Sequence, residues 1–174
     1  MRKIYCAFVV VLLVLVCSAA SPVRLKRVRL ESAGTISIPA SWNVIAESSP
    51  VSENAYGQGV SGRSLLTARN DDGSTLAIFT YWPAPNKTSS EVAKDVSKSL
   101  RGISQPSRFD KESEMQFGNI RASIISYPLD GGIYQKVTAF IHGGKIYCAV
   151  INYRPDDEYE ITNLVRRIIN YWRF

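Results

Sequence analysis

Residues 116–153 decide the fold and read QFGNIRASIISYPLDGGIYQKVTAFIHGGKIYCAVINY. Three runs of β-branched and aromatic residues, at 120–129, 133–142 and 145–153, have the composition of paired strands. They are bounded by Gly-Asn, Asp-Gly-Gly and Gly-Gly, which form tight turns because these residues tolerate positive φ. The stretch therefore predicts an antiparallel meander.

The strand expected over 145–153 is largely apolar on both faces. A strand that faces water on one side alternates apolar and polar residues, and a strand covered on both sides does not. We therefore expect an α+β fold in which helices flank an antiparallel sheet on both faces, an α/β/α sandwich. The two faces carry Ile146, Cys148, Val150 and Asn152 on one side, and Tyr147, Ala149, Ile151 and Tyr153 on the other.

Two helices are expected to supply these covers. A closing helix follows Pro155, Asp156 and Asp157, because negative charge near a helix N-terminus is favoured by the helix dipole. A second helix opens with the capping box Thr88-Ser89-Ser90-Glu91 and ends at Gly102. The closing helix has an apolar stripe at the helical period, made of Ile161, Leu164, Val165, Ile168, Ile169 and Trp172.

The N-terminal half predicts a short strand and a loop. Residues 35–38 alternate and meet Pro39, which cannot continue a strand ladder, so we expect Trp42 to pack back under the sheet. Residues 47–62 are rich in Ser, Gly, Pro and Asn, and we expect a surface loop there.

A hairpin is expected next, with strands at 64–69 and 75–82 around a turn at 70–74. Asp71 and Asp72 in this turn lack the spacing of a calcium-binding loop, so we interpret them as turn residues.

Composition indicates one exported domain. The chain has 174 residues and a formal net charge of +6, which is too small an excess to predict nucleic-acid binding. Residues 1–20 have the charged, apolar and small-residue regions of a signal peptide, and we expect cleavage after Ala20. Two alternatives stay open: lipidation of Cys17, although Val16 stands where a small residue is preferred, and a retained leader that anchors the protein. Either way, the location is periplasmic or otherwise extracytoplasmic, and the domain proper covers residues 34–174.

Residues 21–33 form a basic segment between the leader and the domain. Its charges are Arg24, Lys26, Arg27 and Arg29, partly alternating with apolar residues. One interpretation is a linker or an edge strand whose charges prevent aggregation. The other is a peripheral contact with anionic lipid.

In its order of elements, the chain resembles the PsbP-like superfamily. The residues that carry the resemblance are the opening Gly34-Thr35-Ile36-Ser37-Ile38-Pro39-Ala40-Ser41-Trp42, followed by the early hairpin, a middle helix, the meander and one closing helix. This superfamily includes the photosystem II extrinsic PsbP subunit, the yeast Ran-binding nuclear transport factor and DcrB-type exported bacterial proteins. The resemblance implies an antiparallel sheet between helices. It implies little about activity, since members of the superfamily mostly bind proteins or are uncharacterised, and it offers no catalytic motif to carry across.

The sequence contains no recognisable catalytic or metal-binding motif. His142 stands beside a glycine turn, and we interpret it as a turn residue. Cys148 lies mid-strand among apolar neighbours and is expected to be a buried small hydrophobe. The acidic residues after Pro155 are explained by helix capping. We therefore predict a non-enzymatic protein without a metal or a cofactor.

The remaining candidates form a binding surface. Aromatic residues at strand ends and arginines on the closing helix can anchor and steer a protein partner. We predict an accessory protein that docks on an envelope or membrane-complex protein. The alternative is a small-ligand or lipid-binding module with a cleft lined by Trp42, Tyr81 and Trp82. The candidate binding residues are Trp42, Tyr81, Trp82, Tyr127, Arg166 and Arg167.

Overall fold

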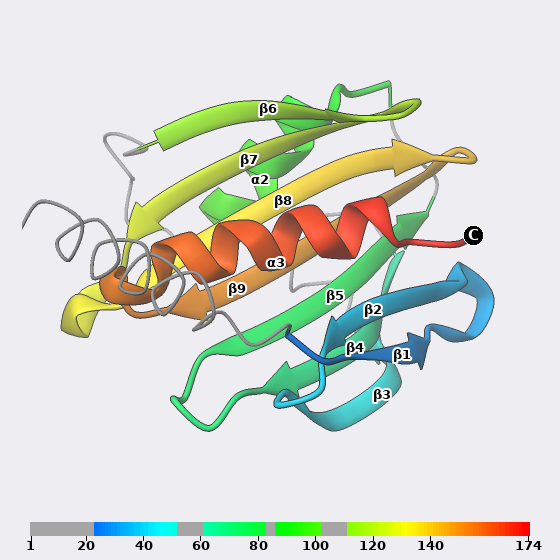
Figure 1. Ribbon diagram of the computed structural model, residues 1–174. Coiled ribbons are helices and arrows are strands. Elements are labelled where there is room, and N and C mark those ends of the chain that lie inside the picture. Colours follow the sequence, from blue (N-terminus) through cyan, green and yellow to red (C-terminus); the bar gives the residue numbers. More distant parts are fainter. Residues whose placement is uncertain (1–22, 52–60, 83–85, 102–110) are drawn as a thin grey trace, which may run out of the picture.

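The computed structural model describes residues 23–51, 61–82, 86–101 and 111–174, so the expected signal peptide lies outside the described residues. Within them, a seven-stranded sheet, a two-stranded sheet and two α-helices form one packed unit (Figure 1). The strands are β1 (Leu25–Arg29), β2 (Thr35–Pro39), β3 (Asn43–Val51), β4 (Ser61–Arg69), β5 (Thr75–Trp82), β6 (Lys111–Phe117), β7 (Ile120–Pro128), β8 (Tyr134–His142) and β9 (Lys145–Tyr153). The helices are α2 (Ser89–Arg101) and α3 (Glu158–Asn170), with single 3-10 turns at η1 (Glu31–Ala33), η2 (Asp130–Gly132) and η3 (Pro155–Asp157).

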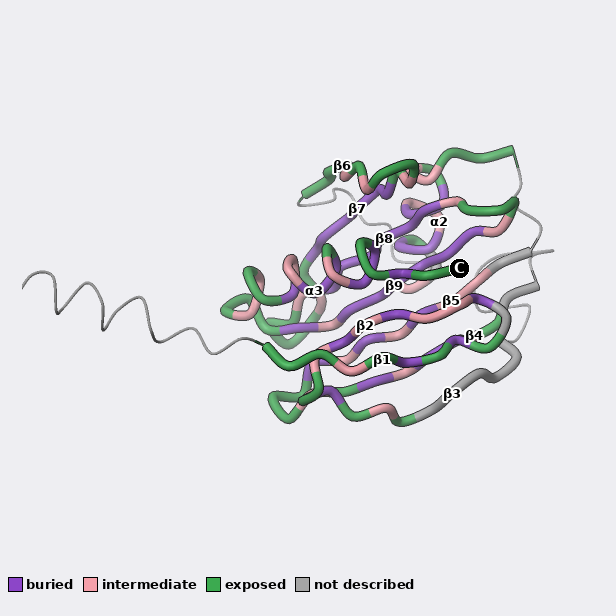
Figure 2. Tube along the Cα trace, turned by 45° about the vertical axis from the view of Figure 1, so that its right-hand side comes forward, coloured by how far each residue is buried: buried purple, intermediate pink, exposed green. Residues whose placement is uncertain are grey.

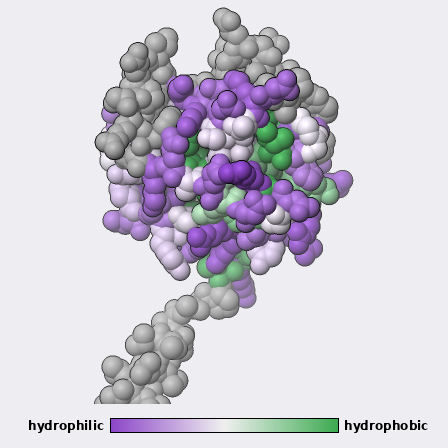
Figure 3. All heavy atoms as spheres, turned by 90° about the horizontal axis from the view of Figure 1, so that it is seen from above, coloured by the Kyte–Doolittle hydropathy of each residue, from purple (hydrophilic) through white to green (hydrophobic). Residues whose placement is uncertain are grey.

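The large sheet has the order β3-β4-β5-β9-β8-β7-β6, and every neighbouring pair is antiparallel. The glycine-punctuated stretch forms β7, β8 and β9, while β6 precedes them at the edge of the sheet. The predicted antiparallel sheet and the α+β class are confirmed. The edge strand β6 is largely exposed and charged, as expected where pairing with another chain must be avoided. Figure 2 shows β6 exposed along most of its length, and the face seen from above in Figure 3 is mainly hydrophilic with some hydrophobic residues between.

Two buried clusters use alternate residues of the central strand β9. Tyr147, Ala149 and Ile151 belong to the cluster that contains the apolar stripe of α3. Ile146, Cys148 and Val150 belong to the cluster that contains the apolar face of α2. In Figure 1, α3 crosses in front of the sheet and α2 lies behind it.

The β1–β2 hairpin packs beside α3 and completes the first cluster. Val28, Ile36 and Ile38 are buried there together with side chains of β4 and β5. The end of the chain ties to this hairpin, because Thr35 N–H donates to the Arg173 carbonyl at 2.7 Å and Arg173 N–H donates to the Thr35 carbonyl at 2.8 Å. Residues 25–29 of the basic segment thus form one of the two strands of the small sheet.

The boundaries predicted for the surface loop at residues 47–62 are wrong at both ends. Strand β3 continues to Val51 and β4 begins at Ser61, while residues 52–60 lie outside the described part. Proline and serine suggested a loop, but β3 is the outermost strand of the sheet. An edge strand tolerates a proline such as Pro50 because one side of its backbone has no ladder to complete.

Candidate functional site

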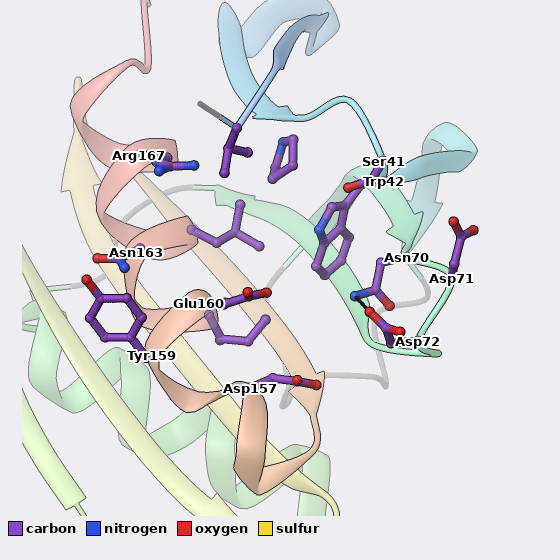
Figure 4. A pocket seen from close by; sticks show the side chains of 14 residues that line it. Ser41, Trp42, Asn70, Asp71, Asp72, Asp157, Tyr159, Glu160, Asn163 and Arg167 are labelled. Carbon is purple, nitrogen blue, oxygen red and sulfur yellow. Dashed lines mark hydrogen bonds between the residues drawn. The ribbon is translucent and has the colours of Figure 1, made fainter. Parts of the chain in front are cut away.

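A cavity of about 480 Å³ opens between the N-terminal half of α3, the β2–β3 turn and the β4–β5 turn (Figure 4). Its volume lies within the range of ~300–1,000 Å³ that is usual for ligand pockets. Val23, which precedes β1, also lines the cavity. The lining consists of Val23, Pro39, Ser41, Trp42, Asn70, Asp71, Asp72, Asp157, Tyr159, Glu160, Ile161, Asn163, Leu164 and Arg167.

Trp42 forms the wall opposite α3. The chain turns after Pro39, where the Trp42 N–H donates to the Pro39 carbonyl at 3.1 Å. This turn carries the indole back against the core, so that Trp42 is only 4% exposed and packs in the same cluster as α3. The packing predicted for Trp42 is confirmed, and the ring presents an apolar surface to the cavity.

The β4–β5 turn is held in shape by its own side chains. The Asn70 side-chain oxygen accepts a hydrogen bond from the Ser74 N–H at 2.8 Å, an Asx-type contact that fixes the loop. The Asn70 amide also donates to Asp72 Oδ2 at 3.5 Å. This turn therefore presents Asp71 and Asp72 at the mouth of the cavity, both of them exposed.

The cavity is acidic although the chain as a whole is basic. Four carboxylates, Asp71, Asp72, Asp157 and Glu160, stand against the single guanidinium of Arg167, for a formal charge of −3. In Figure 4 the carboxylates of Asp157, in η3, and of Glu160, in α3, point toward the side of the cavity formed by Trp42 and the β4–β5 turn. Asp157 Oδ2 is buried, and no group in the described part of the chain hydrogen-bonds to it. A buried acceptor without a partner is costly, which favours a donor entering the cavity.

The first turn of α3 is fixed to the sheet by a buried lysine. Lys136, in β8, is 4% exposed, and its Nζ donates to Glu158 Oε1 at 2.7 Å and to Thr162 Oγ1 at 2.8 Å. The Tyr153 hydroxyl donates to the other oxygen of Glu158. This network sets the position of the helix that carries Asp157 and Glu160.

Electrostatics keep Glu158 ionised. Burial alone would raise the pKa of its carboxyl, but hydrogen bonds from Lys136 and Tyr153, with the charge of Lys136, outweigh burial and leave the pKa below its ordinary value. Burial, followed by the hydrogen bond to Glu158, raises the pKa of Tyr153, so its hydroxyl remains a donor.

Among the candidate binding residues, Trp42 and Arg167 meet at the cavity. Arg166 is exposed but absent from the lining, as expected for the next residue on a helix, which points about 100° away. Trp42 precedes β3, next to the β4–β5 turn, whereas Tyr81 and Trp82 stand at the far end of β5. At ~3.3 Å per residue, this is roughly 20 Å away. The cleft expected to hold Trp42, Tyr81 and Trp82 together is therefore wrong, and the side chains of the last two lie outside the described part.

Tyr127 belongs to the core. It is fully buried in the cluster with α2, and its hydroxyl hydrogen-bonds to Gln135, whose amide donates to Asn152 Oδ1 at 2.7 Å. A proline follows Tyr127, but the strand end is covered by the helix, so this aromatic side chain is not at the surface. His142 is exposed at its turn and stacks on Phe174 with ring centroids 3.7 Å apart.

The sequence interpretation missed the acidic lining. Asp71 and Asp72 were explained by a turn, and Asp157 and Glu160 by helix capping. Both explanations hold locally, but only the fold brings the two acidic segments to one cavity. Within the described residues, no group of His, Cys, Asp and Glu side chains is arranged to hold a metal ion. None of the helices described is long and apolar enough to cross a membrane.

The fold is PsbP-like. Comparison with solved structures gives cyanobacterial PsbP (CyanoP) from Synechocystis sp. PCC 6803 at 14% identity and a TM-score of 0.57, covering 89% of this chain and 95% of that one. LpqN, a protein involved in cell envelope biogenesis of Mycobacterium tuberculosis, gives 16% identity and a TM-score of 0.39, covering 83% and 87%. No family model and no curated protein sequence matches the chain.

Proposed function

We propose that the chain is an exported, non-enzymatic accessory protein that docks on a protein of the envelope or of a membrane complex. The observation that carries the proposal is the cavity between α3 and the two turns, which is lined by Trp42 and by carboxylates from both the β4–β5 turn and the start of α3. Export rests on the leader at residues 1–20, with cleavage after Ala20. We take α2 and α3 as covers of opposite faces of the sheet, which leaves the ends of the strands and the turns for recognition.

The lining suits a cationic side chain of the partner. An ammonium or guanidinium group interacts favourably with the face of an indole and forms charge-assisted hydrogen bonds with carboxylates. It would also supply the donor that Asp157 Oδ2 lacks. We therefore expect a lysine or arginine of the docked protein to enter between Trp42 and Glu160.

A non-enzymatic role is supported by the chemistry of the lining, which includes neither histidine nor cysteine. Cys148 is fully buried in the core, and burial raises the pKa of its thiol, so it is no nucleophile in the native state. The similarity to CyanoP, at 14% identity, supports the PsbP-like fold on which the proposal builds.

Affinity capture from the native envelope tests this function. The baits are three full-length chains: the wild type, a cavity variant and a control. The cavity variant is Asp72→Asn with Glu160→Gln, two changes at exposed residues that remove negative charge from the cavity. The matched control is Asp130→Asn with Glu114→Gln, both exposed and outside the cavity. We expect the wild type and the control to capture one stoichiometric partner, and high salt to weaken this binding. The cavity variant should not capture the partner. A partner retained equally by both variants contradicts docking at this site, and the intact mass of the bait reports how the leader is processed.

A second candidate is a small-ligand module, favoured by the size of the cavity alone. It predicts a rise in melting temperature with a small organic cation such as cadaverine, in the absence of any protein partner. A rise that disappears in the cavity variant, together with no captured protein, would favour this alternative.

A further inference from the structure

The outer face of the β1–β2 hairpin has its own chemistry, and its residues Leu25, Arg27 and Arg29 do not line the cavity, although Val23 and Pro39 beside them do. Val28 points into the core, so the alternation of a strand turns Leu25, Arg27 and Arg29 outward. Their cross-strand neighbours on β2 are Pro39, Ser37 and Thr35. This outer face therefore carries two exposed arginines, an exposed leucine and uncharged neighbours, and no acidic residue.

The positive charge of the hairpin is uncompensated. Arg24, Lys26, Arg27 and Arg29 form no ion pair with any described residue. Glu31, which follows β1, is already engaged by Arg63 at 2.9 Å. The positive charge of the hairpin is thus available to attract an anion from outside the chain.

Exposed apolar residues accompany these charges. Val23 is 51% exposed and Leu25 is 42% exposed, next to Arg24 and Arg27. Apolar side chains together with arginines on one surface are typical of segments that lie at a membrane interface, where the first enter the headgroup region and the second meet lipid phosphates. In the sequence, the apolar run of the leader at residues 7–16 comes shortly before this face.

We propose that the outer face of the β1–β2 hairpin binds an anionic lipid surface, with Arg27 and Arg29 as the phosphate contacts and Leu25 as the apolar contact. The face is basic and partly apolar. This inference is independent of the docking function, because it uses another surface and a ligand of opposite charge. The hairpin face would hold the protein on the membrane while the acidic cavity remains open to a partner.

Vesicle flotation tests the inference, with the full chain as its host processes it. The vesicles are phosphatidylcholine alone and phosphatidylcholine with 30 mol% phosphatidylglycerol (about one lipid in three) at low and high salt. The variant is Arg27→Gln with Arg29→Gln, and the matched control is Lys98→Gln with Arg154→Gln, which removes the same charge from exposed positions outside the hairpin. Thermal melting verifies that all three proteins are folded.

We expect the wild type and the control to bind the anionic vesicles more tightly than the neutral ones, with a loss in high salt. The hairpin variant should lose affinity on the order of 20-fold, from about fivefold per arginine near a charged surface. Equal affinity of the variant and the control for the anionic vesicles would overturn the inference. Binding that does not depend on the anionic lipid would assign membrane contact to the leader, and loss of a captured protein without loss of vesicle binding would make the face a protein contact.

Discussion

Lys136 is a charged side chain inside the core, and its ammonium donates hydrogen bonds to Glu158 and Thr162 at the N-terminal end of α3. The two members of the ion pair differ in exposure, at 4% for the lysine side chain and 40% for the glutamate. Removal of one partner from a buried pair is destabilising because the remaining charge has no compensation. The penalty must therefore depend on which partner is removed.

We expect Glu158→Gln to cost more than Lys136→Met. The first leaves an ammonium in the core without its counter-charge, and the free energy of unfolding at pH 7 should fall by about 2–4 kcal/mol. The second leaves a carboxylate that water can reach, and the loss should be smaller. Urea denaturation gives both values, with Glu160→Gln as the exposed control on the same helix. An equal or larger loss for Lys136→Met would contradict this account of the pair.

The same pair predicts a pH dependence. The pKa of Glu158 lies below its ordinary value of 4.5, so the folded state binds the proton more weakly than the unfolded state. Its contribution to stability is complete above pH 4.5 and is lost as the pH falls through the lower folded-state pKa. The stability difference between the wild type and Glu158→Gln should therefore shrink below pH 4.5. A difference that grows on acidification would show that the sign of the shift is wrong.

At the scale of elements, Gly34 joins the β1–β2 hairpin to the end of the chain. Its φ is +91°, and a Cβ added there would lie 1.9 Å from the Arg173 carbonyl oxygen. Gly143, in the β8–β9 turn, also has a positive φ, +55°, but a Cβ there would meet nothing within 4 Å. Substitutions at these two glycines therefore distinguish the cost of backbone strain from the cost of steric overlap.

Gly143→Ala should cost only the strain of a left-handed conformation, about 1–2 kcal/mol. Gly34→Ala adds displacement of the backbone that pairs Thr35 with Arg173, so we expect at least about 2 kcal/mol more. Thermal or urea denaturation of the two variants gives the comparison. Equal losses would mean that the hairpin and the end of the chain separate at little cost.

The sequence predicted those elements that depend on neighbouring residues, and it did not predict features that depend on residues far apart in the chain. The glycine turns, the capping box at Thr88 and the apolar stripe of α3 are local, and each element formed where expected; Thr88 N–H donates to Glu91 Oε2 at 2.7 Å. The continuation of β3 to Val51 was missed because Pro50 disfavours a central strand but not an edge strand. Nothing local in the sequence marks Lys136 as a buried ion-pair member, since its partners lie on a distant helix.

The site was only partly predictable for the same reason. Trp42 stood out because a tryptophan after a strand-ending proline has to pack somewhere, and Arg167 because it lies on an amphipathic helix. The acids from two distant turns share the cavity only after folding. Tyr127 resembles a surface aromatic in sequence, and nothing local indicates that α2 covers it.

For the whole molecule, the shared core predicts that the rest of the chain does not fold without α3. The apolar stripe of α3, the β1–β2 hairpin and one face of the sheet belong to a single buried cluster, and Trp172 Nε1–H donates to the Ala33 carbonyl at 2.7 Å across that cluster. A chain that ends at Pro155 lacks this stripe and exposes one face of β8 and β9 to water. At ~1.5–3 kcal/mol for each large apolar side chain, the loss is comparable to the ~5–15 kcal/mol net stability of a domain.

We therefore expect no cooperative thermal transition in the chain ending at Pro155. Cys148 reports the outcome, because it is fully buried in β9 and its thiol can be alkylated only when the core opens. Peptide mapping distinguishes it from Cys6 and Cys17. As a milder variant, Leu164→Ala should lower stability by about 2–5 kcal/mol while the transition stays cooperative and Cys148 stays protected at low temperature. A shortened chain that melts cooperatively with Cys148 protected would show that α2 and the sheet form a core independent of α3.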